Sequence, residues 1–122
     1  MADDKIKAAV KILKEGLAST VYNIKEENIS IQPGAENGLL ITIKGSIIAQ
    51  SKAEGIALGL TSAGATGVTY PQVSVASNDG NGTMKLNYSG NIDQLLALEP
   101  KQISGLVGFH CSAEKARVTK GK

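Results

Sequence analysis

Residues 72–89 read QVSVASNDGNGTMKLNYS, two runs of alternating apolar and polar side chains on either side of a turn. In the second run Met84, Leu86 and Tyr88 fall on one face of an extended strand. The connection Asn78–Gly82 consists of residues that tolerate positive φ, which is typical of a tight turn between antiparallel strands. This stretch therefore predicts a β-hairpin with one buried face.

A second hairpin signal lies nearer the N-terminus. Alternating runs at Asn28–Gln32 and Leu39–Lys44 are separated by a Pro-Gly pair at 33–34 and an Asn-Gly pair at 37–38. We also interpret Gly105–Cys111 as a final strand. The chain is thus expected to form an antiparallel sheet of four or five strands.

Two other segments indicate helices. Residues 4–23 carry an apolar stripe at spacings of three and four, which predicts a long first helix from Ile6, Val10, Leu13, Leu17 and Val21. Ser51 and Glu54 have the spacing of a capping box, so a second, short helix is expected over 51–63. Residues 92–98 fit either a short helix or a strand.

These elements predict an α+β fold in which the long N-terminal helix packs on the sheet. With 122 residues, the chain has room for one domain, which we assign to residues 1–113. Residues 114–122 are interpreted as a flexible basic tail containing Lys115, Arg117, Lys120 and Lys122. Such a tail is either a contact for phosphate or an acidic partner, or a solvated terminus.

The composition argues against several functions. Aromatic residues make up 3% of the chain, so platforms for stacking bases are scarce and nucleic acid is not the expected partner. No segment reaches the ~18 apolar residues that a membrane-spanning helix needs. The start, Met-Ala-Asp-Asp-Lys, is unlike a signal peptide, so we expect a cytosolic protein or a trimmed ectodomain.

No pattern in the sequence indicates catalysis, a cofactor or a metal. The lone histidine and lone cysteine, His110 and Cys111, are too few for a zinc site, and as neighbours on a strand they would face opposite ways. Gly59 and Gly64 have the spacing of a phosphate loop, but Ala65 stands where the loop needs lysine. We interpret Cys111 as a small apolar residue; the alternative is an enzyme that uses it as a nucleophile.

One pair of small residues suggests a contact surface. Gly55 and Gly59 are one turn apart on the second expected helix, and their spacing presents a flat face for close backbone approach. That face would meet either another element of this domain or a partner.

From Val68 to Ser112 the order of features resembles the C-terminal half of a type IV pilin globular domain. The matching segments are Tyr70–Val75, Asn78–Gly82, Thr83–Tyr88, Leu96–Pro100 and Gly105–Cys111. The resemblance implies a fibre subunit whose N-terminal helix packs on an antiparallel sheet. The sequence departs from that family because Cys111 has no cysteine partner, and neither the processing site nor the hydrophobic stem is present.

Residues 5–76 also resemble BON domains, through an Asn-Gly turn into the alternating strand Leu39–Ile43 and the order helix, strand, strand, helix, strand. This likeness implies an envelope module that binds membranes or partners. We therefore expect a non-enzymatic assembly subunit, of a fibre, ring or virion-like structure, whose partners are copies of itself or other assembly proteins. The alternative is a module that binds an envelope or an anionic polymer.

Overall fold

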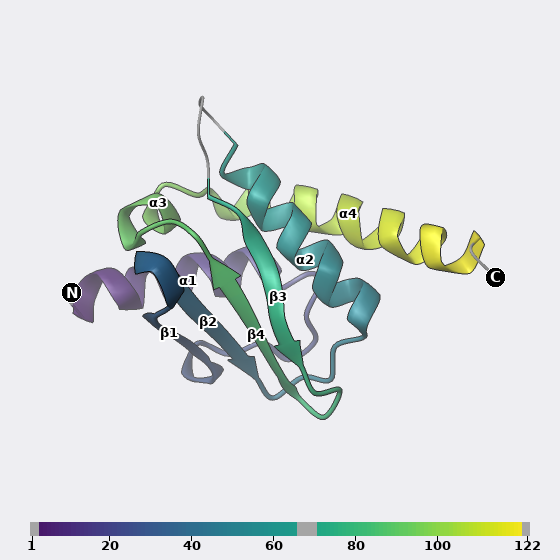
Figure 1. Ribbon diagram of the computed structural model, residues 1–122, viewed down its shortest axis with the longest axis horizontal. Helices are drawn as coiled ribbons and strands as arrows, with labels where there is room; N and C mark the ends of the chain where they lie inside the picture. Colours follow the sequence, from purple (N-terminus) through teal and green to yellow (C-terminus); the bar gives the residue numbers. More distant parts are fainter. Residues whose placement is uncertain (1–2, 66–70, 121–122) are drawn as a thin grey trace.

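The computed structural model describes residues 3–65 and 71–120, and from residue 114 onward it describes the backbone alone (Figure 1). The fold is α+β, as the sequence predicts. In chain order the elements are α1 (Asp3–Leu17), β1 (Ile29–Pro33), β2 (Leu39–Lys44), α2 (Gln50–Ala63), β3 (Val73–Asn78), β4 (Thr83–Tyr88), α3 (Ile92–Leu96) and α4 (Pro100–Lys120). Single turns of 3₁₀ helix precede β1 and β2, at Glu26–Asn28 and Ala35–Asn37.

The two hairpins predicted from the sequence form one antiparallel sheet of four strands in the order β1-β2-β4-β3. Strands β2 and β4 join the hairpins side by side at the centre. Ile41 of β2 lies opposite Ile31 of β1 on one side and Leu86 of β4 on the other. The side chains of these three residues point to the same face and are buried.

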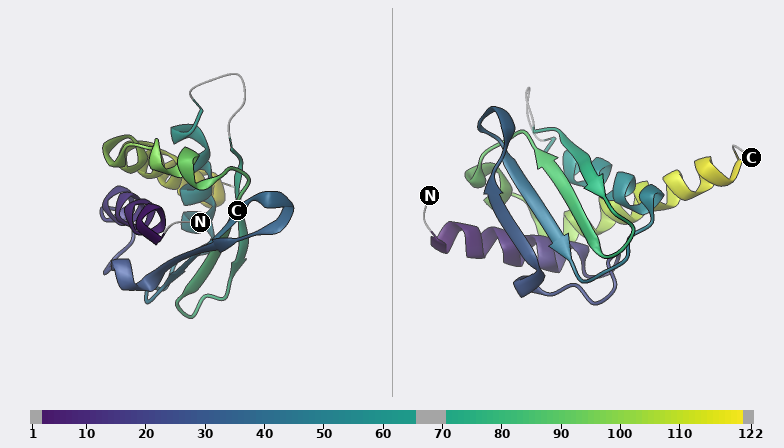
Figure 2. Two further views of the ribbon diagram at one scale, coloured as in Figure 1. Left: turned by 90° about the vertical axis from the view of Figure 1, so that its left-hand side faces the viewer. Right: turned by 60° about the horizontal axis from the view of Figure 1, so that its bottom comes forward.

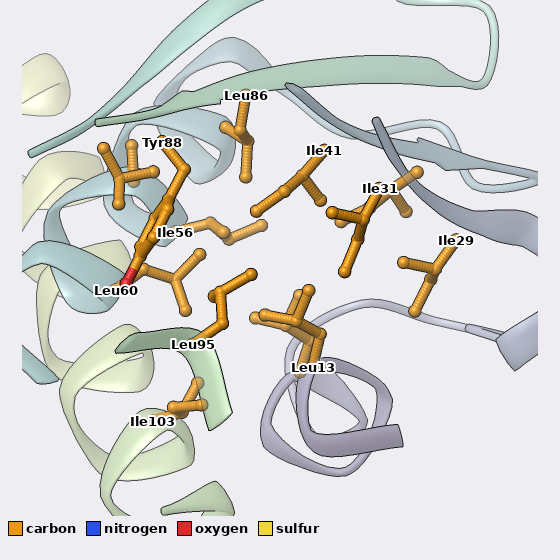
Figure 3. Close-up of a cluster of buried hydrophobic side chains, with 14 of the residues drawn as sticks. Leu13, Ile29, Ile31, Ile41, Ile56, Leu60, Leu86, Tyr88, Leu95 and Ile103 are labelled. Atoms are coloured by element: carbon orange, nitrogen blue, oxygen red, sulfur yellow. The ribbon is translucent and has the colours of Figure 1, made fainter. Parts of the chain in front are cut away.

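The helices form a second layer on that face (Figure 2). On β1, Ile29 and Ile31 are buried toward the helices, whereas Ser30 and Gln32 between them are exposed on the opposite face. The core between the layers is aliphatic: Leu13, Ile56, Leu60 and Ile103 from the helices belong to one buried cluster with the isoleucines of the sheet (Figure 3). Burial of these side chains, at ~25 cal/mol per Å² of apolar surface, is the main source of stability.

Helix α1 is shorter than the predicted span of residues 4–23. It ends at Leu17, and the amide of Val21 donates to the Leu17 carbonyl at 2.8 Å in the turn that follows. Asn23 has a φ of 61°, which no helix accommodates. The turn places Val21 and Ile24 in the core, so burial determined the path where helix propensity was weak.

Helix α2 is confirmed, but its predicted capping box is wrong. The helix begins one residue before Ser51, and its N-cap is Ala49, which makes no side-chain hydrogen bond. A capping box occurs instead at α3, where Asn91 and Gln94 each accept the other's backbone N–H. This box decides the ambiguous segment 92–98 in favour of a helix.

The largest correction concerns Gly105–Cys111, which is not a strand but the middle of α4. Pro100 starts this helix at a position where a missing N–H costs nothing. Ile103 and Val107, one turn apart, are fully buried against the other helices. The segment was expected to form the final strand, and burial of the helical stripe Ile103–Val107 is what makes it a helix instead.

Three glycines allow the backbone of α4 to lie close to α1 and α2. A Cβ added at Gly16 of α1 would lie 2.7 Å from the Ile103 side chain. On α2, a Cβ at Gly55 would lie 2.6 Å from the Cα of Cys111, and one at Gly59 would lie 2.5 Å from the Cα of Val107. The last two contacts are with backbone, which side-chain rotation cannot relieve.

We therefore expect Gly59→Ala to lower the free energy of unfolding by about 2–3 kcal/mol, because the added methyl group overpacks the contact with α4. Gly105→Ala is the matched control: it adds the same group to a helical glycine with no atom within 4 Å. The control should raise stability by up to ~1 kcal/mol. Urea unfolding of dilute protein measures both, and equal effects would contradict the close approach of the two helices.

Candidate interaction surface

The residues that the sequence analysis singled out lie in two places. Gly55 and Gly59 are buried at the contact between α2 and α4, so their flat face meets another element of the same domain. Lys115, Arg117 and Lys120 lie on the C-terminal part of α4, where the backbone alone is described. Lys122 lies outside the described residues, as do Thr66 and Tyr70.

Helix α4 presents a solvent-facing side that was not expected from the sequence, because Gly105–Cys111 was predicted to form a strand. We call this side the outer face of α4 and define it by Gly105, Gly108 and Phe109. The Phe109 side chain is 66% exposed, and no atom lies within 4 Å of a Cβ built on either glycine. The helical spacing of Ile103 and Val107 would have shown in the sequence which residues point the other way.

The glycines of the outer face are unlike those of the helix contacts. Each costs a helix about 1 kcal/mol relative to alanine. At Gly55 and Gly59 the close approach of α4 offsets that cost. At Gly105 and Gly108 nothing in the described part of the chain does so.

Another exposed apolar pair lies at the loops that follow α1 and β2. Tyr22 is 90% exposed and Ile47 is 78% exposed. The two loops are joined by the Ser46 hydroxyl, which donates to the Tyr22 carbonyl. The loop after α1 is also linked to α2, because Lys52 Nζ donates to the Thr20 carbonyl at 3.1 Å. This surface therefore has a fixed backbone below two solvent-facing side chains.

A serine and the histidine come together between α2 and α4. Ser62 Oγ and His110 Nε2 are 3.1 Å apart, and the His110 ring meets Phe109 edge to face with centroids 5.2 Å apart. A serine nucleophile needs its histidine to be oriented by a third group. Among the described residues, Ser62 is the only hydrogen-bond partner of the His110 ring. The pair therefore links α2 to α4.

Cys111 is half-buried on α4, one residue after His110. Helical geometry turns the two side chains about 100° apart rather than to opposite faces. The Cys111 thiol donates a weak hydrogen bond to the Lys52 carbonyl, with sulfur and oxygen 3.5 Å apart. Burial raises the pKa of this thiol, and the nearby Lys52 charge opposes the rise only in part.

The remaining motifs are structural. Asp79 Oδ1 accepts from the backbone N–H of Asn81 at 2.7 Å and of Thr83 at 3.1 Å, and these bonds lower the pKa of the carboxyl group. They close the turn between β3 and β4. Gly59–Gly64 lies at the end of α2, and in the described part of the chain no three metal-binding side chains are grouped together.

Comparisons of the chain with protein-family models, with curated proteins and with solved structures found no match. Over the described residues, none of the helices has both the length and the hydropathy required to cross a bilayer.

The raised pKa of Cys111 predicts a poorly reactive thiol. At a pH near the pKa of an ordinary cysteine, the native protein should react with a disulfide reagent severalfold more slowly than urea-unfolded protein, because the thiolate is the nucleophile. Lys52→Ala should slow the native reaction further. Equal rates in native and unfolded protein would show that the thiol is not shielded and that its pKa is not raised.

Proposed function

We propose that this chain is a non-enzymatic assembly subunit that associates with a second copy through the outer face of α4. The proposal rests on one observation: Phe109 is exposed beside two glycines that no contact within the described chain explains. Glycines on a helix allow another backbone to come close. A second α4 is the element that this surface suits, as the contact between α2 and α4 illustrates.

The geometry of a helix face favours a two-fold arrangement. In such a dimer the outer face of α4 meets itself, so Phe109 of each copy packs over the glycines of the other. None of the three residues that define this face is charged. The only charged side chain described on the exposed side of α4 is that of Lys101, in its first turn.

The edges of the sheet are less suited to association. Strand β1 ends in Pro33, which lacks the N–H that a further strand would need. Strand β3 is irregular between Val75 and Ser77, where its register with β4 shifts. Proline and bulges at edge strands oppose pairing with another sheet, so the helix face is the better candidate.

The energies suggest a reversible contact. Burying one phenylalanine contributes about 1.5–3 kcal/mol, and a two-fold dimer buries two. Association itself costs about 4–15 kcal/mol in lost freedom of motion. The aromatic pair, at about 3–6 kcal/mol, reaches only the low end of this cost. The close helix contact must therefore contribute, and we expect the assembly to depend on concentration.

Sedimentation velocity over a range of protein concentrations tests this function. The unaltered protein should shift from monomer to a larger species, and Phe109→Ser should move the transition to higher concentration by tenfold or more, at an unchanged melting temperature. Leu58→Ser is the control, since it removes another exposed apolar side chain, on α2, 42% exposed. A protein that stays monomeric at high concentration would exclude self-association.

A further inference from the structure

Tyr88 differs from the other side chains of the core. It is the last residue of β4 and is 3% exposed, and its ring reaches from the sheet toward the helices (Figure 3). Its hydroxyl has no hydrogen-bond partner among the described residues. Burial raises the pKa of Tyr88 to about 12, so the hydroxyl stays neutral and can both donate and accept.

A buried hydroxyl without a partner is unfavourable by about 1–3 kcal/mol. Phenylalanine would fill the same space without that cost, and nothing else in the aliphatic core requires a polar group. The hydroxyl therefore calls for a partner that is not part of the described chain.

The Tyr88 side chain lines a pocket of about 300 Å³ at the end of the helical layer. The end of α2 forms one wall, and the segment from α3 to the start of α4 forms another. Gly90 lets three groups converge there, since a Cβ on it would lie 2.4 Å from Gln94 Oε1, 2.7 Å from Pro71 and 2.8 Å from the Tyr88 ring. Such a volume suits a small molecule.

The charges around the pocket favour a cation. Helix α2 ends at Ala63, and its carbonyl end, which carries partial negative charge, lies at the wall. Among the described residues, Glu99 is the only acidic one that lines this pocket, and it also lines a neighbouring hollow, which it shares with Lys101. At the start of α4, Pro100 has no N–H and the N–H of Ile103 donates to the Glu99 carbonyl, so the N–H groups of Lys101 and Gln102 are those that an anion could still meet there.

We propose that this pocket binds a small organic cation that also carries a hydroxyl or similar hydrogen-bonding group. The cationic end lies by Glu99 and the carbonyl end of α2, and the polar group pairs with the Tyr88 hydroxyl. That oxygen exposes less than 1 Å², so binding shifts the side chains that cover it. The site is distinct from the outer face of α4 and does not depend on self-association.

Three probes of equal length test the proposal: 4-amino-1-butanol, 1,4-butanediol and 4-hydroxybutyrate, which carry positive, zero and negative charge. Each is titrated at millimolar concentration into the ¹⁵N-labelled full chain, and the amide resonances of Gly64, Ala97 and Gln102 are followed. The amino alcohol should shift these resonances saturably, the diol should bind severalfold more weakly, and the hydroxy acid should not bind.

Two variants separate the ligand from the fold. Tyr88→Phe should abolish saturable binding of the amino alcohol while the melting temperature of the ligand-free protein stays level or rises, because the unpaired hydroxyl is gone. Glu99→Gln, at an exposed position, should lower the affinity for the amino alcohol to that for the diol.

The opposite results would overturn the site. Absence of saturable shifts with all three probes would show that the pocket is not a binding site for such molecules. Equal affinities for the amino alcohol and the diol would show that the positive charge of the ligand is not recognised. If the Tyr88→Phe protein binds the amino alcohol as tightly as the unaltered protein, the Tyr88 hydroxyl does not contact the ligand. A Tyr88→Phe protein that is less stable and binds no probe would mean that an enclosed water already satisfies the hydroxyl.

Discussion

The contact of α4 with α1 and α2 is the constraint on which the rest of this structure depends. Gly16, Gly55 and Gly59 leave no room for a Cβ beneath it, and Ile103 and Val107 fill the space that they provide. Helices at this separation cover the aliphatic face of the sheet as one layer. Among the described residues Tyr88 is the one buried aromatic side chain, and a core so rich in aliphatic groups needs this close packing, since these groups gain their dispersion energy only at short range.

The same contact determines both surfaces that we consider functional. With Ile103 and Val107 turned inward, helical periodicity turns Gly105, Gly108 and Phe109 outward. The start of α4, at Pro100, sets the distance between the end of α2 and the segment after α3, and thus the pocket beside Tyr88. A single helix orientation therefore produces both the outer face of α4, for which we propose a second copy, and the pocket beside Tyr88, for which we propose a small molecule.

The groups between α2 and α4 that could act as nucleophiles are held by helix packing. Ser62 and His110 share a hydrogen bond without a group to orient the histidine, and the half-buried Cys111 holds its proton more tightly than an ordinary thiol. The mutual distances of these groups follow from helix packing. The Tyr88 hydroxyl lacks a partner within the described part of the chain, and packing alone gives no reason for this polar group.

The sequence by itself determined the α+β class, both hairpins and the first two helices. The alternation around Met84–Tyr88 and the apolar stripe around Leu13 are local patterns, and each allows only one secondary structure that buries all of its apolar side chains on one face. The sequence did not determine the end of α1 at Leu17, the N-cap of α2 or the state of Gly105–Cys111. There the local preferences are weak or mixed: valine and phenylalanine favour a strand, and glycine favours neither a strand nor a helix. Only the tertiary structure decided them, because the gain from burying Ile103 and Val107 against the glycines of neighbouring helices exceeds any preference that the segment has alone.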